Sequence, residues 1–158
     1  MLNKSIYLLT EYQIFEYPID KDTINQIVAD SNLKLVTLKK LLFDRFIDDE
    51  ILTPKTQNNA FRENIIHEIG HVYCHCGNSL MKNKIIVNKQ EKQAETFAAY
   101  FLMPVYVFEE AMKYCNNDFE LAEEFGVTVK FVHYRKKHTE AIIKDGYFDE
   151  PLEQINFD

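Results

Sequence analysis

Residues 61–77 have the sequence FRENIIHEIGHVYCHCG, and at its centre His67-Glu68-Ile69-Gly70-His71 forms an H-E-x-x-H motif. On a helix, positions i and i+4 lie one turn apart on the same face, so His67 and His71 can direct two imidazole nitrogens at one metal ion. Glu68 follows the first histidine and can reach a water molecule on that ion. This layout is typical of zinc metallopeptidases with a glutamate general base. We therefore predict a metal-binding helix over about residues 60–76.

A third ligand is expected downstream, because catalytic zinc usually takes three protein ligands and leaves a fourth position for water. The stretch KQEKQAETFAAYFLM at 89–103 predicts a strong helix that carries two acidic candidates. Glu91 and Glu95 are i and i+4 on this helix and therefore share a face. Spacing alone leaves both carboxylates open as the third ligand.

The motifs taken together resemble the ImmA/IrrE family of intracellular metallopeptidases. The resemblance rests on HEIGHVYCH, on FAAYFLMP at 97–104 and on LAEEFGVTVKFVHYR at 121–135, in the family's order, and it covers about residues 45–136. The segment from Glu91 to Glu95 also looks like the E-x-x-A-[D/N/E] pattern of gluzincin-type peptidases. That likeness implies that Glu91 is the ligand and Glu95 a supporting residue, with exchanged roles as the alternative. Glu95 and Thr128 depart from the residues that are most usual in the family.

The family resemblance implies a zinc-dependent endopeptidase with a regulatory role, in which Zn²⁺ is the cofactor and Glu68 the catalytic base. It also implies a protein substrate, such as a helix-turn-helix repressor of a mobile element or stress response. The alternative is a non-enzymatic regulator whose structural metal site helps it to capture a repressor. Glu68 favours the enzyme, because a purely structural site would not need that carboxylate.

The predicted fold class is α+β, mostly helical, with a small antiparallel or mixed sheet packed beside the metal-binding helix. Residues 34–38, KLVTL, are extended in character, and FIDDEILT at 46–53 is typical of a strand pair that turns near Asp48-Asp49. A short helix at 118–125, a turn at Gly126 and a helix at 128–144 predict a C-terminal helix-turn-helix-like pair.

We expect one metallopeptidase domain over 1–158. It comprises a catalytic core at 20–115, in which Asp20 caps a first helix, and a C-terminal helical tail at 118–145. No structure is predicted for residues 1–19.

Composition restricts the partners and the compartment. The net charge of −7 over 158 residues argues against direct nucleic-acid binding, and no apolar run is long enough to cross a membrane. The N-terminus has no signal-peptide pattern. Three cysteines, Cys74, Cys76 and Cys115, do not make a disulfide framework and fit a reducing cytoplasm. Oligomeric state is not predicted.

Other polar residues near the motifs receive the simpler interpretation. His75 is assigned a packing role or a supporting contact, since one straight helix cannot easily wrap three histidines around an ion. By residue type, Tyr100, His133, Tyr134 and Arg135 could each stabilise a developing oxyanion. We expect instead that Tyr100 packs on its helix and that Arg135 forms a solvated basic face with Lys136 and Lys137.

Overall fold

The computed structural model describes residues 1–38, 45–47, 50–54, 59–74 and 84–144. Seven helices and three short strands lie within these ranges. In chain order they are α1 Leu2–Glu11, α2 Lys21–Asp30, β1 Lys34–Leu38, β2 Arg45–Ile47, β3 Glu50–Pro54, α3 Asn59–Cys74, α4 Lys84–Leu102, α5 Val105–Tyr114, α6 Asp118–Phe125 and α7 Val129–Lys144. None of the helices in the described ranges is both long and apolar enough to span a bilayer.

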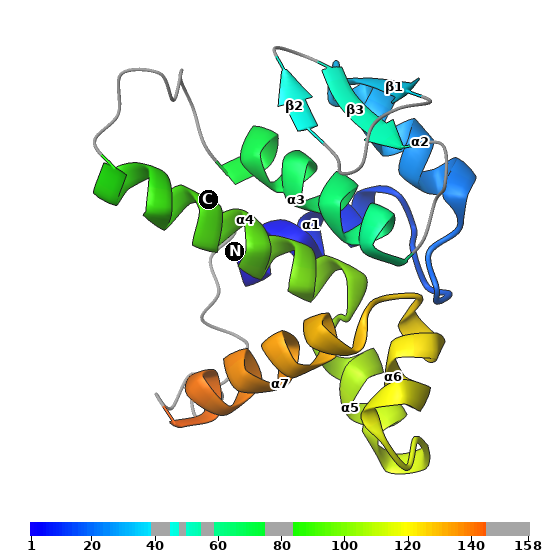
Figure 1. Cartoon of the computed structure of the whole chain (residues 1–158). Coiled ribbons are helices and arrows are strands. Elements are labelled where there is room, and N and C mark those ends of the chain that lie inside the picture. Colours follow the sequence, from blue (N-terminus) through cyan, green and yellow to red (C-terminus); the bar gives the residue numbers. More distant parts are fainter. Residues whose placement is uncertain (39–44, 48–49, 55–58, 75–83, 145–158) are drawn as a thin grey trace.

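The core is built around α3 and α4, which run side by side through the middle of the molecule (Figure 1). One face of α3 buries Ile65, Ile66 and Ile69 completely, and α4 buries a continuous run from Phe97 to Leu102. Burial of these apolar side chains stabilises the fold and leaves the opposite face of α3 available for polar groups. The two histidines of the motif lie on that polar side, with exposed fractions near one quarter.

Gly70, the variable position of the motif beside His71, allows α3 and α4 to approach closely. A Cβ atom at Gly70 would lie 3.0 Å from Cδ1 of Phe97 and 3.2 Å from both the Cα atom and the carbonyl oxygen of Ala94. Phe97 and Ala94 are fully buried, so neither has room to move away. The glycine therefore sets the separation of the two helices that carry the candidate ligands.

A Gly70→Ala substitution is expected to lower the free energy of unfolding by about 1–3 kcal/mol, the usual cost of overpacking a core. Glycine-to-alanine changes inside an unobstructed helix normally add about 1 kcal/mol of stability, so a net loss isolates the helix–helix contact. Urea unfolding of the parent, Gly70→Ala and the exposed α3 control Asn64→Ala measures the effect. Unchanged or increased stability of Gly70→Ala would contradict the close packing.

The predicted α+β class requires a correction, because every side chain that the structure describes as buried lies on a helix or on a loop beside one. The strands are only three to five residues long and form a sheet of order β1-β3-β2. β1 pairs in parallel with β3, and β2 pairs antiparallel with it. The sheet lies at one edge of the molecule near α2 and α3 (Figure 1). The described core is therefore helical, and the short strands form a small sheet beside it.

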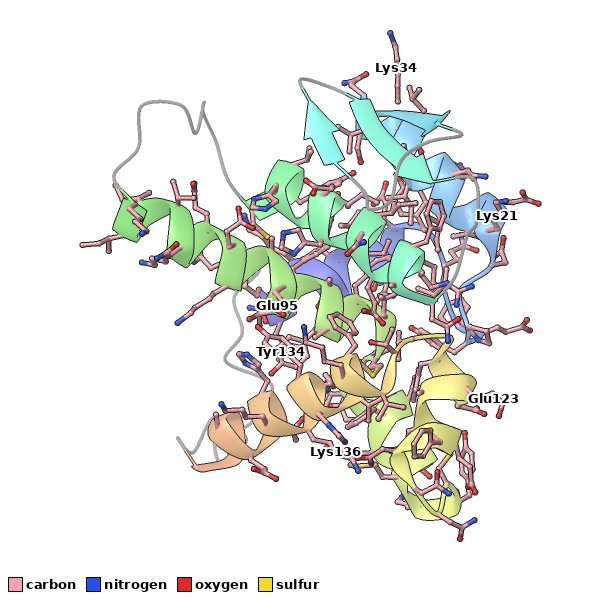
Figure 2. The ribbon with its side chains drawn as sticks, in the orientation of Figure 1. Lys21, Lys34, Glu95, Glu123, Tyr134 and Lys136 are labelled. Atoms are coloured by element: carbon pink, nitrogen blue, oxygen red, sulfur yellow. The ribbon has the colours of Figure 1, made fainter. Side chains whose placement is uncertain are left out.

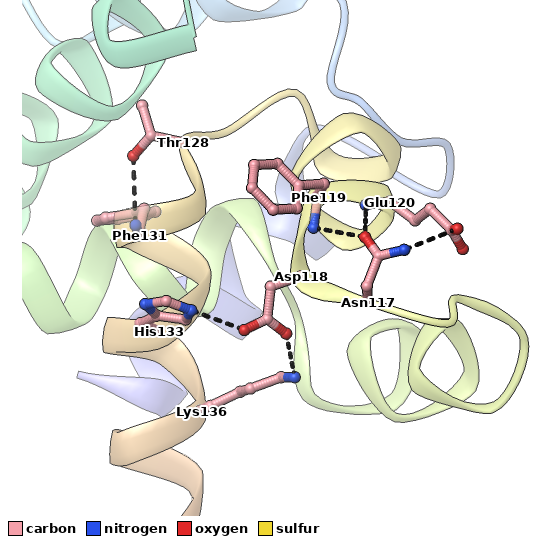
Figure 3. Close-up of polar contacts among 8 residues, drawn as sticks. All are labelled: Asn117, Asp118, Phe119, Glu120, Thr128, Phe131, His133 and Lys136. Atoms are coloured by element: carbon pink, nitrogen blue, oxygen red, sulfur yellow. Dashed lines mark hydrogen bonds and ion pairs between the residues drawn. The ribbon is translucent and has the colours of Figure 1, made fainter.

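The C-terminal pair of helices is defined by its caps (Figure 3). Asn117 begins α6, and its Oδ1 atom accepts hydrogen bonds from the backbone N–H groups of Phe119 and Glu120 at 3.0 and 3.1 Å. Gly126 ends α6 with a φ of 59°, in the left-handed region that favours glycine. The Thr128 hydroxyl accepts from the N–H of Phe131 at 3.2 Å and so caps α7.

Ionic contacts then hold α7 against the start of α6. Asp118 pairs with His133 at 2.7 Å through one carboxylate oxygen and with Lys136 through the other (Figure 3). The hydrogen bond from Lys136 is the largest cause that lowers the pKa of the Asp118 carboxyl. A partly exposed ionic cluster of three residues thus holds α6 and α7 together.

The turn between α6 and α7 is also bound to the first turns of α3. Nδ2 of Asn59 donates to the carbonyl of Val127 at 3.0 Å, and Nη1 of Arg62 donates to the carbonyl of Gly126 at 2.9 Å. Glu63 accepts from the N–H of Thr128 and, at 3.2 Å, from its hydroxyl. These contacts fix the C-terminal pair relative to the helix that carries the H-E-x-x-H motif.

Glu63 should make stability depend on pH. Burial is the largest influence on its pKa and raises it above the ordinary value of 4.5, although the hydrogen bonds from Thr128 act in the opposite direction. Since the folded-state pKa exceeds the unfolded one, the contribution of Glu63 to stability is complete below the unfolded value and is lost as pH rises through the folded value.

Glu63→Gln does not titrate yet keeps an oxygen that can accept from Thr128. The free energy of unfolding of Glu63→Gln minus that of the parent should therefore increase between pH 4.5 and pH 7. Paired urea titrations of the two proteins measure this difference. A difference that is constant with pH, or that changes in the opposite direction, would contradict the assigned shift.

Candidate metal centre

Three of the residues singled out by the motifs converge in space. His67 and His71 lie one turn apart on α3, and Glu91 reaches them from α4. The Nε2 atoms of the two histidines are 3.1 Å apart. Oε2 of Glu91 lies 3.3 Å from Nε2 of His67, and Oε1 of Glu91 lies 3.4 Å from Nε2 of His71. The two imidazole rings lie with their centroids 4.8 Å apart and their planes inclined at 75°.

The donor set fits a tetrahedral ion. Zinc bonds to imidazole nitrogen and carboxylate oxygen are about 2.0–2.1 Å long, and ligands at the corners of such a tetrahedron are about 3.3 Å apart. The 3.1 Å between the two histidine nitrogens is close to that edge length, and each of the two Glu91 oxygens lies at a similar distance, 3.3 or 3.4 Å, from one of these nitrogens. Two nitrogens and one carboxylate are also the ligand types that catalytic zinc uses. His67, His71 and Glu91 could therefore hold a metal ion.

The site is open to solvent on its Glu91 side. The Glu91 side chain is 55% exposed, whereas His67 and His71 are 25% and 24% exposed. Partial exposure leaves access for water or for a peptide beside the three donor atoms. Glu68 directly follows His67 on α3 and is half-buried.

Glu95, the alternative ligand, does not join the three converging groups among the described residues. Its carboxylate lies instead near Tyr134 of α7, where its negative charge helps to raise the pKa of the Tyr134 hydroxyl, although burial is the largest cause of that rise. Figure 2 shows Glu95 and Tyr134 facing each other in the space between α4 and α7. The two acidic residues on this face of α4 thus point to different partners.

The other candidate residues from the sequence lie in different surroundings. His75 and Cys76 lie outside the described residues. Cys74 ends α3 as a half-buried free thiol whose pKa is raised chiefly by burial, which disfavours the reactive thiolate. His133 forms its ion pair with Asp118 of α6.

Arg135 corrects the sequence interpretation, because it is not part of a solvated basic face. Only 1% of the residue is exposed, and it is the largest of the fully buried side chains in the described ranges. Its guanidinium carbon lies 4.4 Å from the ring centroid of Tyr100 and 4.9 Å from that of Phe108. Nε donates to the Met103 carbonyl at 2.9 Å, just beyond the C-terminus of α4.

A buried arginine in this position has a physical explanation. Two aromatic faces and the negative end of the α4 dipole stabilise the cation where water cannot. Burial lowers the pKa of Arg135 to about 10, so the guanidinium remains charged at neutral pH. The helical period of α7 could have indicated that Arg135 is buried, because Arg135 shares one buried face of this helix with Phe131 and Val132.

Comparison with known proteins identifies a family for this chain. The family model described as the IrrE N-terminal-like domain, a peptidase family, matches residues 51–137, more than half of the chain. No curated protein matches. A solved structure named Mycobacterium tuberculosis transcriptional regulator is similar, with a TM-score of 0.67, 15% identity and coverage of 85% of this chain.

The match to that regulator shows a shared fold, and it covers 46% of the regulator, so this chain spans less than half of its length. The family match includes the helix with His67 and His71 and the helix with Glu91. It also extends through Arg135. The chain belongs to the family of IrrE N-terminal-like domains.

Proposed function

We propose that this chain is a zinc-dependent endopeptidase with His67, His71 and Glu91 as metal ligands and Glu68 as general base. The observation that carries the proposal is the convergence of three donor groups at separations of 3.1–3.4 Å. Membership of a peptidase family supports hydrolysis of a peptide bond as the reaction.

Zinc in this position would supply a Lewis acid that lowers the pKa of a water molecule and polarises the scissile carbonyl. Neutral His67 and His71 and ionised Glu91 would orient that chemistry from two helices. Glu68 would take one proton from the water as the water oxygen bonds to the scissile carbonyl carbon, and the C–N bond would break afterwards. The carboxylic acid so formed would return the proton to the leaving amine, which restores Glu68 as the carboxylate.

The proposed substrate is a cytoplasmic DNA-binding protein, such as a helix-turn-helix repressor of a mobile element or stress response. A net charge of −7 favours a basic protein partner over direct contact with nucleic acid. Similarity to a structure named as a transcriptional regulator favours a second candidate function. In this second candidate function the metal site would be structural, and the chain would capture a repressor without cleaving it.

Incubation with a purified repressor encoded beside this gene distinguishes the two functions. The zinc-loaded chain is expected to convert the repressor into two fragments whose masses sum to that of the intact protein plus one water. Removal of zinc with a chelator should stop the cleavage, and added zinc should restore it. Stable, zinc-dependent binding of an intact repressor would contradict the peptidase and support capture.

A further inference from the structure

Val72 is a large apolar side chain that α3 leaves in contact with water. It is 40% exposed, whereas the apolar residues of the helix that point into the core are buried, namely Phe61, Ile65, Ile66 and Ile69. A single exposed apolar residue is common on protein surfaces and indicates nothing by itself. What Val72 can do therefore depends on where it lies relative to the candidate metal centre.

The helical period places Val72 beside the proposed general base. Residues four apart on a helix lie in one row along its surface, so Glu68 and Val72 share a row. His67 and His71 form the neighbouring row, and Gly70 lies in the row beyond them, where it contacts α4. Starting from α4, the surface of α3 thus presents first the two candidate ligands and then Glu68 with Val72.

The row that contains Glu68 changes from polar to apolar along the helix. Asn64, one turn before Glu68, is exposed, Glu68 is half-buried, and Val72, one turn after it, is exposed. Valine can neither donate nor accept a hydrogen bond through its side chain, and its branched Cβ allows few rotamers. It therefore offers a fixed apolar surface, and contact with another apolar group would remove that surface from water, which is favourable.

We infer that Val72 is a specificity-determining residue, which selects an apolar side chain next to the scissile bond of the substrate. The inference rests on the proposed function, because a peptide whose carbonyl reaches both the ion and Glu68 lies beside the row that contains Val72. A charged side chain in the same place would lose part of its hydration without gaining a hydrogen bond from Val72. The substrate class is thereby narrowed to proteins with an apolar residue at the bond that is cleaved.

Two hydroxamates that differ by one side chain test the inference without a cleavage assay. N-acetylleucine hydroxamate carries an isobutyl group next to its metal-binding atoms, where N-acetylglycine hydroxamate carries hydrogen. Isothermal titration calorimetry gives the dissociation constant of each compound for the zinc-loaded chain. The parent is expected to bind the leucine compound about tenfold more tightly, as is usual for an added apolar group in a hydrophobic contact. Val72→Ala should reduce this preference to about threefold, and Val72→Asp should abolish it.

Met112→Ala on α5 is the matched control, since Met112 has nearly the same exposed fraction, 39%. Its preference for the leucine compound should equal that of the parent. The zinc dissociation constant, measured by competition with a chromophoric chelator, should agree within about twofold for the parent, Val72→Ala and Met112→Ala. Selectivity is thereby separated from a general loss of structure.

The outcomes distinguish the role of Val72 from the proposed function. If the parent binds zinc and both hydroxamates, the role of Val72 alone is overturned by the same preference in Val72→Ala as in the parent, or by no preference in the parent. A parent that binds no zinc would overturn the proposed function as well. A parent that binds zinc but neither hydroxamate would do the same, because a catalytic ion needs an open position.

Discussion

A Glu68→Gln variant is expected to keep its zinc and to lose about 10²–10⁴-fold in the rate of peptide cleavage, the usual contribution of a general base. Glutamine has nearly the shape of glutamate but cannot accept a proton from water at neutral pH. The three converging ligand groups are not changed by the substitution. Rates measured on the same repressor substrate, with zinc content determined on the same samples, check the result.

Glu68→Gln also has a matched control on the same helix. Glu63→Gln removes a carboxylate five residues earlier on α3, where the acid binds Thr128. That variant should cleave at a rate within about twofold of the parent. Full activity of Glu68→Gln would show that another group acts as the base, and loss of zinc in it would show that Glu68 supports the metal instead.

An Arg135→Ala variant is expected to lose roughly 3–5 kcal/mol of stability, similar to other large-to-small changes in a core. The substitution removes the cation between Tyr100 and Phe108 and leaves the Met103 carbonyl without its hydrogen bond from Nε. It also creates a cavity where the largest fully buried side chain was. Urea unfolding followed by circular dichroism measures the loss.

Arg135→Met separates the effect of volume from that of charge. Methionine fills most of the space without the cost of a buried cation, and replacing buried charges by apolar groups is often tolerated. The methionine variant should therefore be clearly more stable than the alanine variant. An Arg135→Ala protein within about 1 kcal/mol of the parent would contradict the assignment of Arg135 to the core.

Local patterns predicted the helices well. Asp20 does cap α2, where its side chain accepts from the N–H of Thr23 at 2.9 Å, and Asn117 and Gly126 delimit α6. Such signals depend on neighbouring residues, so sequence alone contains them. The segments at 34–38 and 46–53 correspond to strands of the small sheet, but periodicity could not show that the described core is helical. The predicted turn at Asp48-Asp49 lies outside the described residues.

Long-range contacts were harder to predict. The sequence did not predict helix α1 within residues 1–19. Its residues Leu8 and Leu9 are buried because they pack into the core, and the local sequence does not show that contact. Arg135 was misassigned for a related reason, since two lysines, Lys136 and Lys137, directly follow it in the sequence. Its burial depends on Tyr100 and Phe108, which are distant in the chain.

The candidate ligands likewise combine a local pattern that the sequence predicts with a long-range contact that it does not. The spacing of His67 and His71 on one helix predicts their common direction. Spacing could not distinguish Glu91 from Glu95, because both lie on one side of α4. In the structure Glu91 lies beside the histidines and Glu95 beside Tyr134. That difference depends on how α4 packs against α3 and α7, which no local pattern contains.

The most direct test of the metal centre is the zinc content of the purified protein by elemental analysis, for the parent and for His71→Ala and Glu91→Ala. The account predicts one zinc ion per parent chain and little or none in either variant, with helical content by circular dichroism preserved. A full equivalent of zinc in folded His71→Ala or Glu91→Ala would contradict it.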